Sequence, residues 1–365
     1  MTIPFLDVGA TYQELRPALD AAMQRVLDSG WFILGAEVAA FESAWAQACE
    51  VPHAVGVGTG LDALVLGLRA MGIGPGDEVI VPAHTFVATA LAVTHVGATP
   101  VFADVDLDTG NLTATHAAPL ITPKTKAILA VHLYGQPADL DELAALCQAH
   151  GLQLIEDAAQ AHGASYKGHP VGRHGAFAAW SFYPGKNLGA FGDGGAVTTL
   201  DADLAAKVRT LRNYGSSRKY LHEEAGVNTR LDALQAAILS VKLGHLKAWN
   251  ARRATLAKAY DEQLPRGLVT PMTQLGDRTS SWHLYVVRTS RRAAVQAALA
   301  EADIGTVVHY PIPCHRQPAY AHAGHRHLPN AERLGEEVIS LPMSPHHSMG
   351  DIERVAEVLR GLAAD

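Results

Sequence analysis

Short apolar segments alternate with amphipathic ones between residues 53 and 200. The apolar segments are HAVGVG from residue 53, DEVIVP from 77, TPVFADVD from 99, KAILAVHLYG from 126 and LQLIEDA from 152. Between them lie stretches with a helical spacing of apolar residues, such as LDALVLGLRAMGI from residue 61 and DLDELAALCQAHG from 139. Near-continuous apolar strands separated by helices are typical of a mostly parallel sheet with helices on both faces. The pattern therefore predicts an α/β fold built on a large, doubly wound, mostly parallel sheet.

The pattern changes near residue 230. Before it, AFAAWSFY from residue 176 and GGAVTTL from 194 predict two more strands on either side of a glycine-rich loop. From Asp232 to Leu264 the sequence predicts one long helix, and later segments, including a strand TVVHYP from residue 306, indicate a smaller α+β unit. We expect a large domain over residues 1–245 and a smaller C-terminal α+β domain over 246–365. The loop-like segment 316–330 is expected to lie over their junction, where ligand clefts are common.

Composition narrows the class of protein. Of the 365 residues, 48% are hydrophobic and 18% are charged, as in ordinary globular proteins. The net charge is −7, and the sequence does not indicate the basic face that nucleic-acid binding needs. An anionic ligand must therefore be bound by donors within its own site and not by the overall charge of the protein. No apolar stretch approaches 18 uninterrupted residues, and the first residues lack the pattern of a signal peptide. We therefore expect a cytoplasmic protein that binds neither membrane nor nucleic acid.

Cysteines and histidines do not indicate a metal centre. Cys49, Cys147 and Cys314 are widely spaced and are expected to be reduced thiols. The histidines of HAGHRH, which begins at residue 322, and the pair at 346 and 347 have no cysteine or carboxylate at ligand spacing. We read them as polar loop residues.

Lys186 stands in the glycine-rich segment SFYPGKNLGAFGDGG, residues 181–195. One interpretation is a surface lysine on a flexible loop. The other is a partly desolvated lysine, whose amine is more often neutral and therefore nucleophilic. The surrounding motifs decide between the two.

Asp157 ends a predicted strand in IEDAAQAHGA, at the edge where open α/β sheets bind ligands. Gln160 follows three residues later and can reach the same space. Asp157 could serve only as a cap for a following helix. The functional alternative is a carboxylate that stays ionised beside a cationic partner.

VGVGTGLDAL, residues 55–64, runs from a strand into a helix, whose first amides form a cradle for a phosphate. A dinucleotide fingerprint is not complete here, because its third glycine would fall at Leu61. The segment at Lys186 is not a P-loop either, because Trp180 stands where that motif needs a glycine. Phe86 follows the strand DEVIVP and is either a core aromatic or a platform for a planar ring. Cradle, aromatic, carboxylate and lysine together form the set that a pyridoxal phosphate (PLP) enzyme requires.

From IPFLDV to ISLPMSP, essentially its whole length, the chain resembles the DegT/DnrJ/EryC1/StrS sugar aminotransferases, which have the aspartate-aminotransferase fold type I. The segments EDAAQAHGA, SFYPGKNLGAFGDGGAV and GVNTRLDALQAA carry this resemblance. It implies that Lys186 forms the Schiff base with PLP, that Asp157 pairs with the ring nitrogen and that Gln160 lies near the phenolic oxygen. The remaining cofactor contacts implied are the stacking ring Phe86, the phosphate site at Thr59, Gly60, Leu61 and Ser181, and Asn228 from the neighbouring subunit of a homodimer.

The resemblance also implies a substrate. Leu61 stands where the family commonly has a hydroxyl residue, and this departure, with HYPIPCHRQPAY from residue 309, resembles the branch that acts on C3 of dTDP-linked keto-deoxysugars. Glutamate is the expected amino donor. Expected sugar contacts are Tyr183, His309 and Tyr310, and expected diphosphate donors are Arg218, Lys219, Tyr220, His309 and His315. The alternatives are a C4 aminotransferase acting on another nucleotide-linked 4-ketosugar and a non-catalytic regulatory relative.

Overall fold

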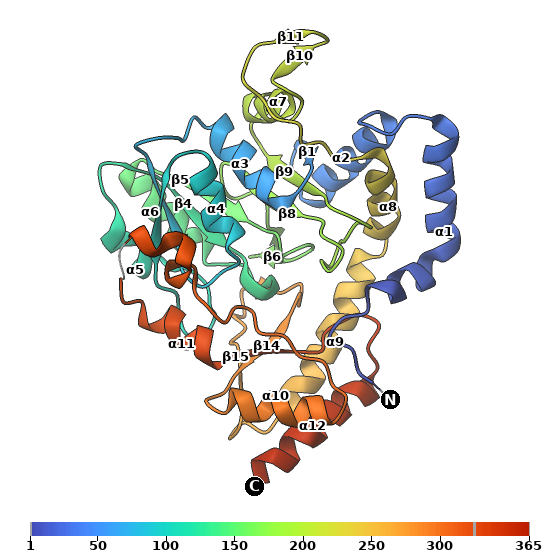
Figure 1. Cartoon of the computed structure of the whole chain (residues 1–365), viewed down its shortest axis with the longest axis vertical. Coiled ribbons are helices and arrows are strands. Elements are labelled where there is room, and N and C mark those ends of the chain that lie inside the picture. The colour runs from blue at the N-terminus through green and yellow to red at the C-terminus, as the bar shows by residue number, and fades with distance from the viewer. Residues whose placement is uncertain (1, 324–325, 365) are drawn as a thin grey trace.

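A seven-stranded sheet forms the centre of the computed structural model, which describes residues 2–323 and 326–364 (Figure 1). Its strand order is β1-β9-β8-β5-β4-β2-β3. The strands are β1 (His53–Val57), β2 (Glu78–Pro82), β3 (Thr99–Ala103), β4 (Thr125–Val131), β5 (Gln153–Asp157), β8 (Ala178–Ser181) and β9 (Gly195–Thr199). Every neighbouring pair is parallel except the two pairs that β9 makes, which are antiparallel. The predicted mostly parallel sheet is confirmed.

Helices cover both faces of this sheet, because alternate strand side chains enter two separate apolar cores. Ile80 and Ile128 face one core, which includes residues of α1 (Val8–Ser29), α2 (Ala36–Ala48), α6 (Leu140–His150) and α8 (Ala233–Leu243). Val79 and Leu129 face the other, which is shared with α3 (Gly60–Ala70), α4 (Ala88–His95) and α7 (Ala202–Leu211). Burial on both faces explains why the strands read as continuous apolar runs rather than as alternating ones.

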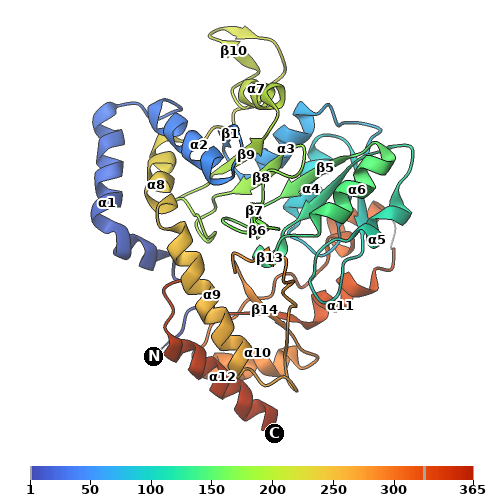
Figure 2. The same ribbon diagram turned by 180° about the vertical axis from the view of Figure 1, so that it is seen from behind.

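The long helix expected from Asp232 to Leu264 is two helices. α8 ends at Leu243, and α9 (Leu246–Gln263) begins after Gly244 and His245. Glycine is a poor helix former, which makes Gly244 a favourable place for the chain to change direction. α9 then leaves the large sheet and runs to the other end of the molecule (Figure 2).

A smaller unit surrounds a third apolar core. It contains a three-stranded sheet of β12 (Thr270–Pro271), β14 (Tyr285–Arg288) and β15 (Val338–Leu341), with α9, α10 (Arg292–Glu301) and α12 (Met349–Ala364). The predicted strand TVVHYP is reduced to an isolated bridge between Val307 and Ser340. Ile3 also belongs to this core and bridges to Ile304, so the start of the chain packs with its last third. We keep the division near residue 245 as a proposal, with the first residues joined to the smaller unit.

Two surface features matter for the site. The segment 316–330, expected as a loop, holds short 3₁₀ turns and the start of α11 (Pro329–Glu337), and it packs on the large unit through Tyr320 against Phe102. His325 lies outside the described residues. A hairpin of β10 (Ser216–Arg218) and β11 (Leu221–His222) projects beyond α7 at the top of Figure 1. None of the helices in the described part of the chain is long and apolar enough to cross a membrane.

Candidate active site

A tight turn after β8 presents Lys186. The amide of Lys186 donates to the carbonyl of Tyr183 at 2.8 Å, and the amide of Ala190 donates to that of Phe182 at 2.8 Å. A side chain at Gly189 would collide with the carbonyl of Pro184, so glycine allows the turn to close. From α8, the ammonium of Lys242 donates to the carbonyl of Gly189 at 2.6 Å. The loop at Lys186 is therefore a fixed turn rather than a flexible surface loop.

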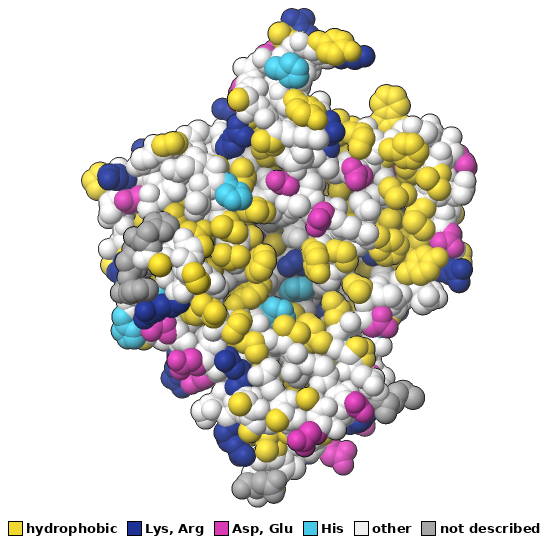
Figure 3. All heavy atoms as spheres, in the orientation of Figure 1, with side chains coloured by type: hydrophobic (Ala, Val, Ile, Leu, Met, Phe, Trp, Pro, Cys, Tyr) yellow, Lys and Arg dark blue, Asp and Glu magenta, His cyan; other side chains and the backbone are white. Residues whose placement is uncertain are grey.

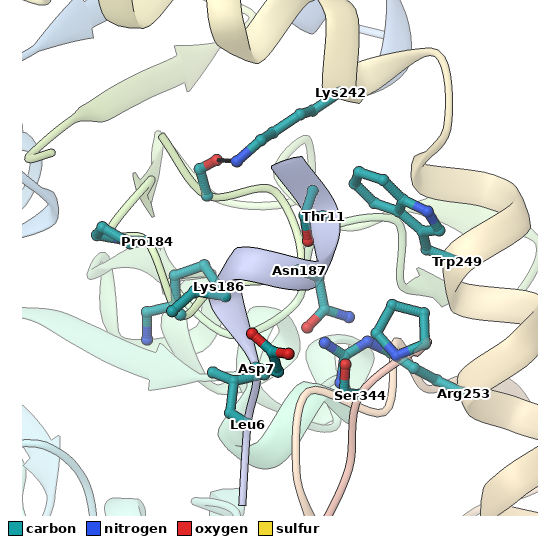
Figure 4. Close-up of a pocket in the computed structure, with 14 residues that line it drawn as sticks. Leu6, Asp7, Thr11, Pro184, Lys186, Asn187, Lys242, Trp249, Arg253 and Ser344 are labelled. Atoms are coloured by element: carbon teal, nitrogen blue, oxygen red, sulfur yellow. Dashed lines mark hydrogen bonds between the residues drawn. The ribbon is translucent and has the colours of Figure 1, made fainter. Parts of the chain in front are cut away.

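The Lys186 amine points away from Lys242 and Arg253, which line a small cavity behind the turn (Figure 4). On its other side Lys186 borders a cavity of about 550 Å³ at the carboxyl ends of the central strands. The cavity is also lined by Thr59, Gly60, Leu61, Leu64, Thr85, Phe86, Val87, Ala88, Leu91, Val131, Asp157, Ala159, Gln160, Ser181, Tyr183, Asp193, His309 and Tyr310. Figure 3 shows hydrophobic side chains gathered around a hollow in the middle of this face. Most cofactor residues expected from the sequence meet in this cavity.

Asp157 is the last residue of β5 and is buried. Its Oδ2 accepts a hydrogen bond from the Thr89 hydroxyl at 2.8 Å, and its Oδ1 accepts one from the amide of Ala159 at 3.2 Å. No N-cap of a described helix falls at Asp157, so helix capping does not explain it. Burial raises the pKa of Asp157, while the two hydrogen bonds and the charge of Lys186 act against that rise. A cation placed in the cavity would favour the ionised carboxylate.

Burial lowers the pKa of Lys186 to about 8, and the negative charge of Asp157 opposes this shift. An ordinary exposed lysine is almost fully charged at neutral pH. Lys186 instead has an appreciable neutral fraction, which is the nucleophilic form. This supports the interpretation of Lys186 as a partly desolvated, reactive lysine.

A buried hydrogen-bonded pair supports the strand end that carries Asp157. His132, just after β4, lies 3.0 Å through Nε2 from Oε2 of Glu156, and its Nδ1 accepts from the amide of Ala138. Glu156 also accepts from the amides of Gly172, His174 and Gly175. The amide of His132 donates to the carbonyl of Asp157 at 3.0 Å, which fixes the backbone of β5 at the cavity.

Gln160 connects the large sheet with the smaller unit. Its Oε1 accepts from the amide of Tyr134 at 2.7 Å, and its Nε2 donates to the Tyr310 hydroxyl at 3.0 Å. The ring of Tyr310 lies 5.6 Å from that of Phe86, and the Tyr134 hydroxyl donates to the carbonyl of His309. Phe86 is 55% exposed, so it is a rim aromatic and not the core residue that the alternative interpretation required.

The start of α3 forms the expected cradle. Thr59 is the N-cap, and its hydroxyl accepts from the amide of Asp62 at 3.0 Å and donates to the Asp62 carboxylate at 2.8 Å. A Cβ at Gly60 would lie 2.7 Å from that of Ser181, so glycine brings the helix start close to the end of β8. The Thr59 hydroxyl is already used within the helix cap. The donors left for an anion are therefore the amides of Gly60 and Leu61 and the Ser181 hydroxyl.

A second cavity of about 190 Å³ adjoins the first between the two units. Its walls include Lys186, Tyr183, His283, His309 and Tyr310. Burial, followed by the charge of Lys186, lowers the pKa of His309 to about 4, and its Nδ1 lies 2.8 Å from the Ser340 hydroxyl. The expected sugar residues Tyr183, His309 and Tyr310 thus line both cavities beside Lys186.

Other expected residues do not line these cavities. Asn228 is exposed, and Arg218, Lys219 and Tyr220 lie on the projecting β10–β11 hairpin. His315 is buried, with its ring beside Phe102 and its Nε2 3.1 Å from Glu332, so its position does not support a substrate contact. Within residues 2–323 and 326–364, no group of three or more metal-ligating side chains occurs.

Sequence reasoning missed Thr89, Tyr134 and Thr229, which hold the site residues in place. Thr89 bonds Asp157, Tyr134 bonds Gln160 and Thr229 bonds the glycine before the cradle. Thr89 lies three residues after Phe86, and Tyr134 follows a predicted strand, so both stood close to motifs that we had singled out. Thr229 directly follows Asn228 in the motif GVNTRLDALQAA, but its partner Gly58 lies 171 residues away, so the sequence did not show what it bonds.

Comparisons with known proteins identify the family of this chain. The model of the DegT/DnrJ/EryC1/StrS aminotransferase family matches residues 13–360. A dTDP-3-amino-3,4,6-trideoxy-alpha-D-glucose transaminase of Streptomyces venezuelae is 51% identical over 362 residues, which cover 98% of this chain and 95% of the relative. A dTDP-3-amino-3,6-dideoxy-alpha-D-galactopyranose transaminase of Aneurinibacillus thermoaerophilus is 48% identical over 357 residues, 98% of each chain.

The fold is likewise shared with a solved structure. The crystal structure of S. venezuelae DesV in complex with a ketimine intermediate superimposes with a TM-score of 0.97 at 50% identity, covering 100% of this chain and 99% of that one. The expected fold type I architecture is confirmed. With a lysine and a carboxylate facing one cavity and a family match over almost its whole length, this chain belongs to the DegT/DnrJ/EryC1/StrS aminotransferase family.

Proposed function

We propose that this enzyme transfers an amino group from glutamate to C3 of a dTDP-linked 3-keto-6-deoxyhexose. The observation that carries the reaction type is the placement of Lys186 and Asp157 on one cavity at the strand ends. The choice of C3 and of a dTDP-sugar rests on two relatives with 51% and 48% sequence identity to this chain, whose names describe dTDP-3-amino-sugar transaminases. Glutamate is the donor expected for the family.

Members of this family use PLP, and the cavity fits that cofactor. The amides of Gly60 and Leu61 and the hydroxyl of Ser181 would hold the phosphate, because they are free donors at a helix start. Phe86, on the rim, would cover a ring face, and Asp157 would pair with the ring nitrogen. When bound, PLP supplies a ring that takes up the electron pair left on carbon after proton loss.

The chain's own groups then divide the remaining work. Lys186 would hold the cofactor through its aldehyde group and, as a free amine, would accept the proton from the donor's α-carbon at Nζ and pass it to the cofactor carbon. Asp157 keeps the ring nitrogen protonated, since a buried carboxylate without a cationic partner would be costly. Tyr183, His309 and Tyr310 would orient the keto sugar in the second cavity, within reach of Lys186.

The residues that do not line the cavity are proposed to act across a homodimer. Arg218, Lys219 and Tyr220 sit on a projecting hairpin, and the exposed Asn228 lies near its base, so a second subunit could receive them. Trp31, Phe32, Ile33 and Phe191 are exposed large hydrophobics, as expected for a surface that another subunit covers. The hairpin cations would then meet the nucleotide diphosphate in the partner's site. The cytoplasm stays the predicted compartment.

The test offers the purified enzyme the 3-keto and the 4-keto dTDP-sugars separately, with PLP and glutamate. Amino-sugar formation is followed by mass spectrometry and NMR, and amination at C3 is expected. Efficient amination only at C4 would overturn the regiochemistry but leave the aminotransferase assignment. A protein that forms no pyridoxamine phosphate from PLP and glutamate would instead be a regulatory relative.

A further inference from the structure

Thr229 connects two parts of the chain that meet at the phosphate cradle. Its side chain is buried, and its Oγ1 accepts a hydrogen bond from the amide of Gly58 at 2.9 Å. Its own amide donates to the carbonyl of Arg212, at the end of α7, at 3.0 Å. Gly58 directly precedes Thr59, Gly60 and Leu61, so this bond acts on the backbone that leads into the cradle.

The bond is needed because β1 is an edge strand. The amides of Gly56 and Gly58 lie two residues apart on the side of β1 that no strand covers. Gly56 finds a partner in Glu42, at 2.8 Å from Oε1, while Gly58 uses Thr229. A part-buried amide that loses its acceptor is left poorly satisfied, so removal of the hydroxyl should let this backbone shift.

The absence of a side chain at Gly58 allows Thr229 to approach its amide. A Cβ at Gly58 would lie 2.5 Å from Oγ1 of Thr229 and 3.1 Å from Oδ2 of Asp62. The carboxylate of Asp62 in turn receives the Thr59 hydroxyl at 2.8 Å. Thr229, Gly58 and the α3 cap therefore form one packed unit in which the cradle amides have little freedom.

The neighbouring residue faces outward. Asn228 is exposed and bridges to Asn213, and the amide of Val227 donates to the carbonyl of Leu211 at 2.8 Å. The strip 227–229 is thus bonded along its length to the end of α7. Within this strip, the Thr229 side chain contacts the cradle of its own subunit, while the Asn228 side chain is exposed.

We propose that Thr229 is a positioning residue for the phosphate cradle of its own subunit, and that it ties this cradle to the strip that presents Asn228 to the partner's phosphate site. The proposal rests on the proposed PLP-dependent homodimer. Thr229 does not line either cavity at Lys186. It acts through the amide of Gly58, so its loss should weaken binding of the phosphate group and leave the chemistry at Lys186 intact.

The first experiment titrates apoenzyme with PLP and, separately, with pyridoxal, which lacks the phosphate, and records absorbance. Thr229→Val keeps the shape but removes the acceptor, and it should weaken PLP binding about five- to tenfold, as the loss of one hydrogen bond predicts. Pyridoxal binding should stay unchanged, and Thr229→Ser should bind PLP as the wild type does. Wild-type PLP affinity in Thr229→Val, or an equal loss for PLP and pyridoxal, would overturn the positioning role.

The second experiment separates a lesion in the same subunit from one in the partner. Each variant is mixed with Lys186→Ala under conditions of subunit exchange, and activity is measured at limiting PLP. Asn228→Ala should be rescued, because the hybrid keeps one site with Lys186 and an intact partner Asn228. Thr229→Val should not be rescued, since its lesion stays in the site that holds the only Lys186.

Rescue of Thr229→Val would place Thr229 in the partner's site and overturn the proposal. Failure to rescue Asn228→Ala, with subunit exchange confirmed by mass spectrometry, would overturn the link between the two sites. Failure of the proposed function is a separate result, because a wild-type protein that binds no PLP would show it in the first titration.

Discussion

Asp157 and Lys186 face one cavity, and each acts on the other's pKa against the effect of burial. Burial lowers the pKa of Lys186 to about 8 while the Asp157 charge raises it. Burial raises the pKa of Asp157, and Lys186 is one of the groups that lower it. Each charge therefore offsets part of the effect of burial on the pKa of the other group.

Lys186→Ala should abolish transamination while the protein stays folded. The amine both captures the cofactor aldehyde and moves the proton, so no other side chain can replace it in both steps. Turnover is measured with the keto sugar and folding by circular dichroism. Lys258→Ala, on the exposed face of α9, is the control and should keep wild-type activity. Near-wild-type turnover in Lys186→Ala would disprove the assignment.

Asp157→Asn should retain PLP but lose several orders of magnitude in the half-reaction with glutamate. A neutral amide does not hold a proton on the ring nitrogen, so the carbanion loses its electron sink. Stopped-flow absorbance measures the rate, and dialysis followed by cofactor assay measures retention. If the rate is unchanged, Asp157 has only a structural role.

The rate at which apoenzyme captures PLP should rise with pH and level off above about 8, where Lys186 becomes neutral. In Asp157→Asn the group that raises the Lys186 pKa is lost, so the midpoint should move to lower pH. Because the pKa is lower in the folded state than the ordinary 10.5, this group also makes the apoenzyme more stable as pH rises from about 8 to 10.5. A capture rate that levels off only near pH 10.5 contradicts the buried environment.

Glu156→Gln should destabilise the fold by about 3 kcal/mol, because an amide NH2 would face buried N–H donors that the carboxylate now accepts from. Burial raises the pKa of Glu156, but the hydrogen bond from His132 and the amides of Gly172 and Gly175 outweigh it and lower the pKa to about 2. The contribution is complete above the ordinary pKa of 4.5 and is lost as pH falls toward 2. Urea unfolding at pH 7 and pH 3 measures it, and the gap between variant and wild type should narrow at pH 3.

Arg218→Ala combined with Lys219→Ala should raise the KM for the nucleotide sugar and leave the glutamate half-reaction unchanged. Both side chains sit on the projecting hairpin, away from the cavity that holds Lys186 in their own subunit. Steady-state kinetics at two salt concentrations should show that the difference shrinks at high salt, because charge attraction is screened. An unchanged KM would remove the hairpin from nucleotide recognition.

Local patterns were enough to predict the central sheet, and they singled out Lys186 and Asp157, which line one cavity in the structure. The strands are buried on both faces and therefore apolar throughout, and Lys186 and Asp157 stand in short motifs with few other interpretations. Contacts between distant segments left no such pattern. Gln160 bonds Tyr310 across 150 residues, and this could only be found in the folded chain.

The less accurate predictions concern where a side chain points or where a helix ends, and not which residue types are present. His315 belongs to a motif near the site, but its ring turns toward Glu332, 17 residues later, and is buried there. The sequence predicted one long helix, whereas the structure has two helices separated at Gly244 and His245. The apolar pattern continues through this point and therefore did not reveal the break. Exposed residues such as Asn228 depend on what covers them, which one chain's sequence does not specify.

The bridge between Ile3 and Ile304 constrains how the polypeptide acquires its fold during synthesis. The two residues are separated by almost the whole chain, and loop closure over such a distance is slow. A ribosome must therefore release most of the protein before the first residues reach their final place. Until residue 304 has been synthesised, Ile3, which is 2% exposed in the folded molecule, lacks the partner that it bridges to, and the neighbouring Phe5 is not yet fixed as a wall of the second cavity.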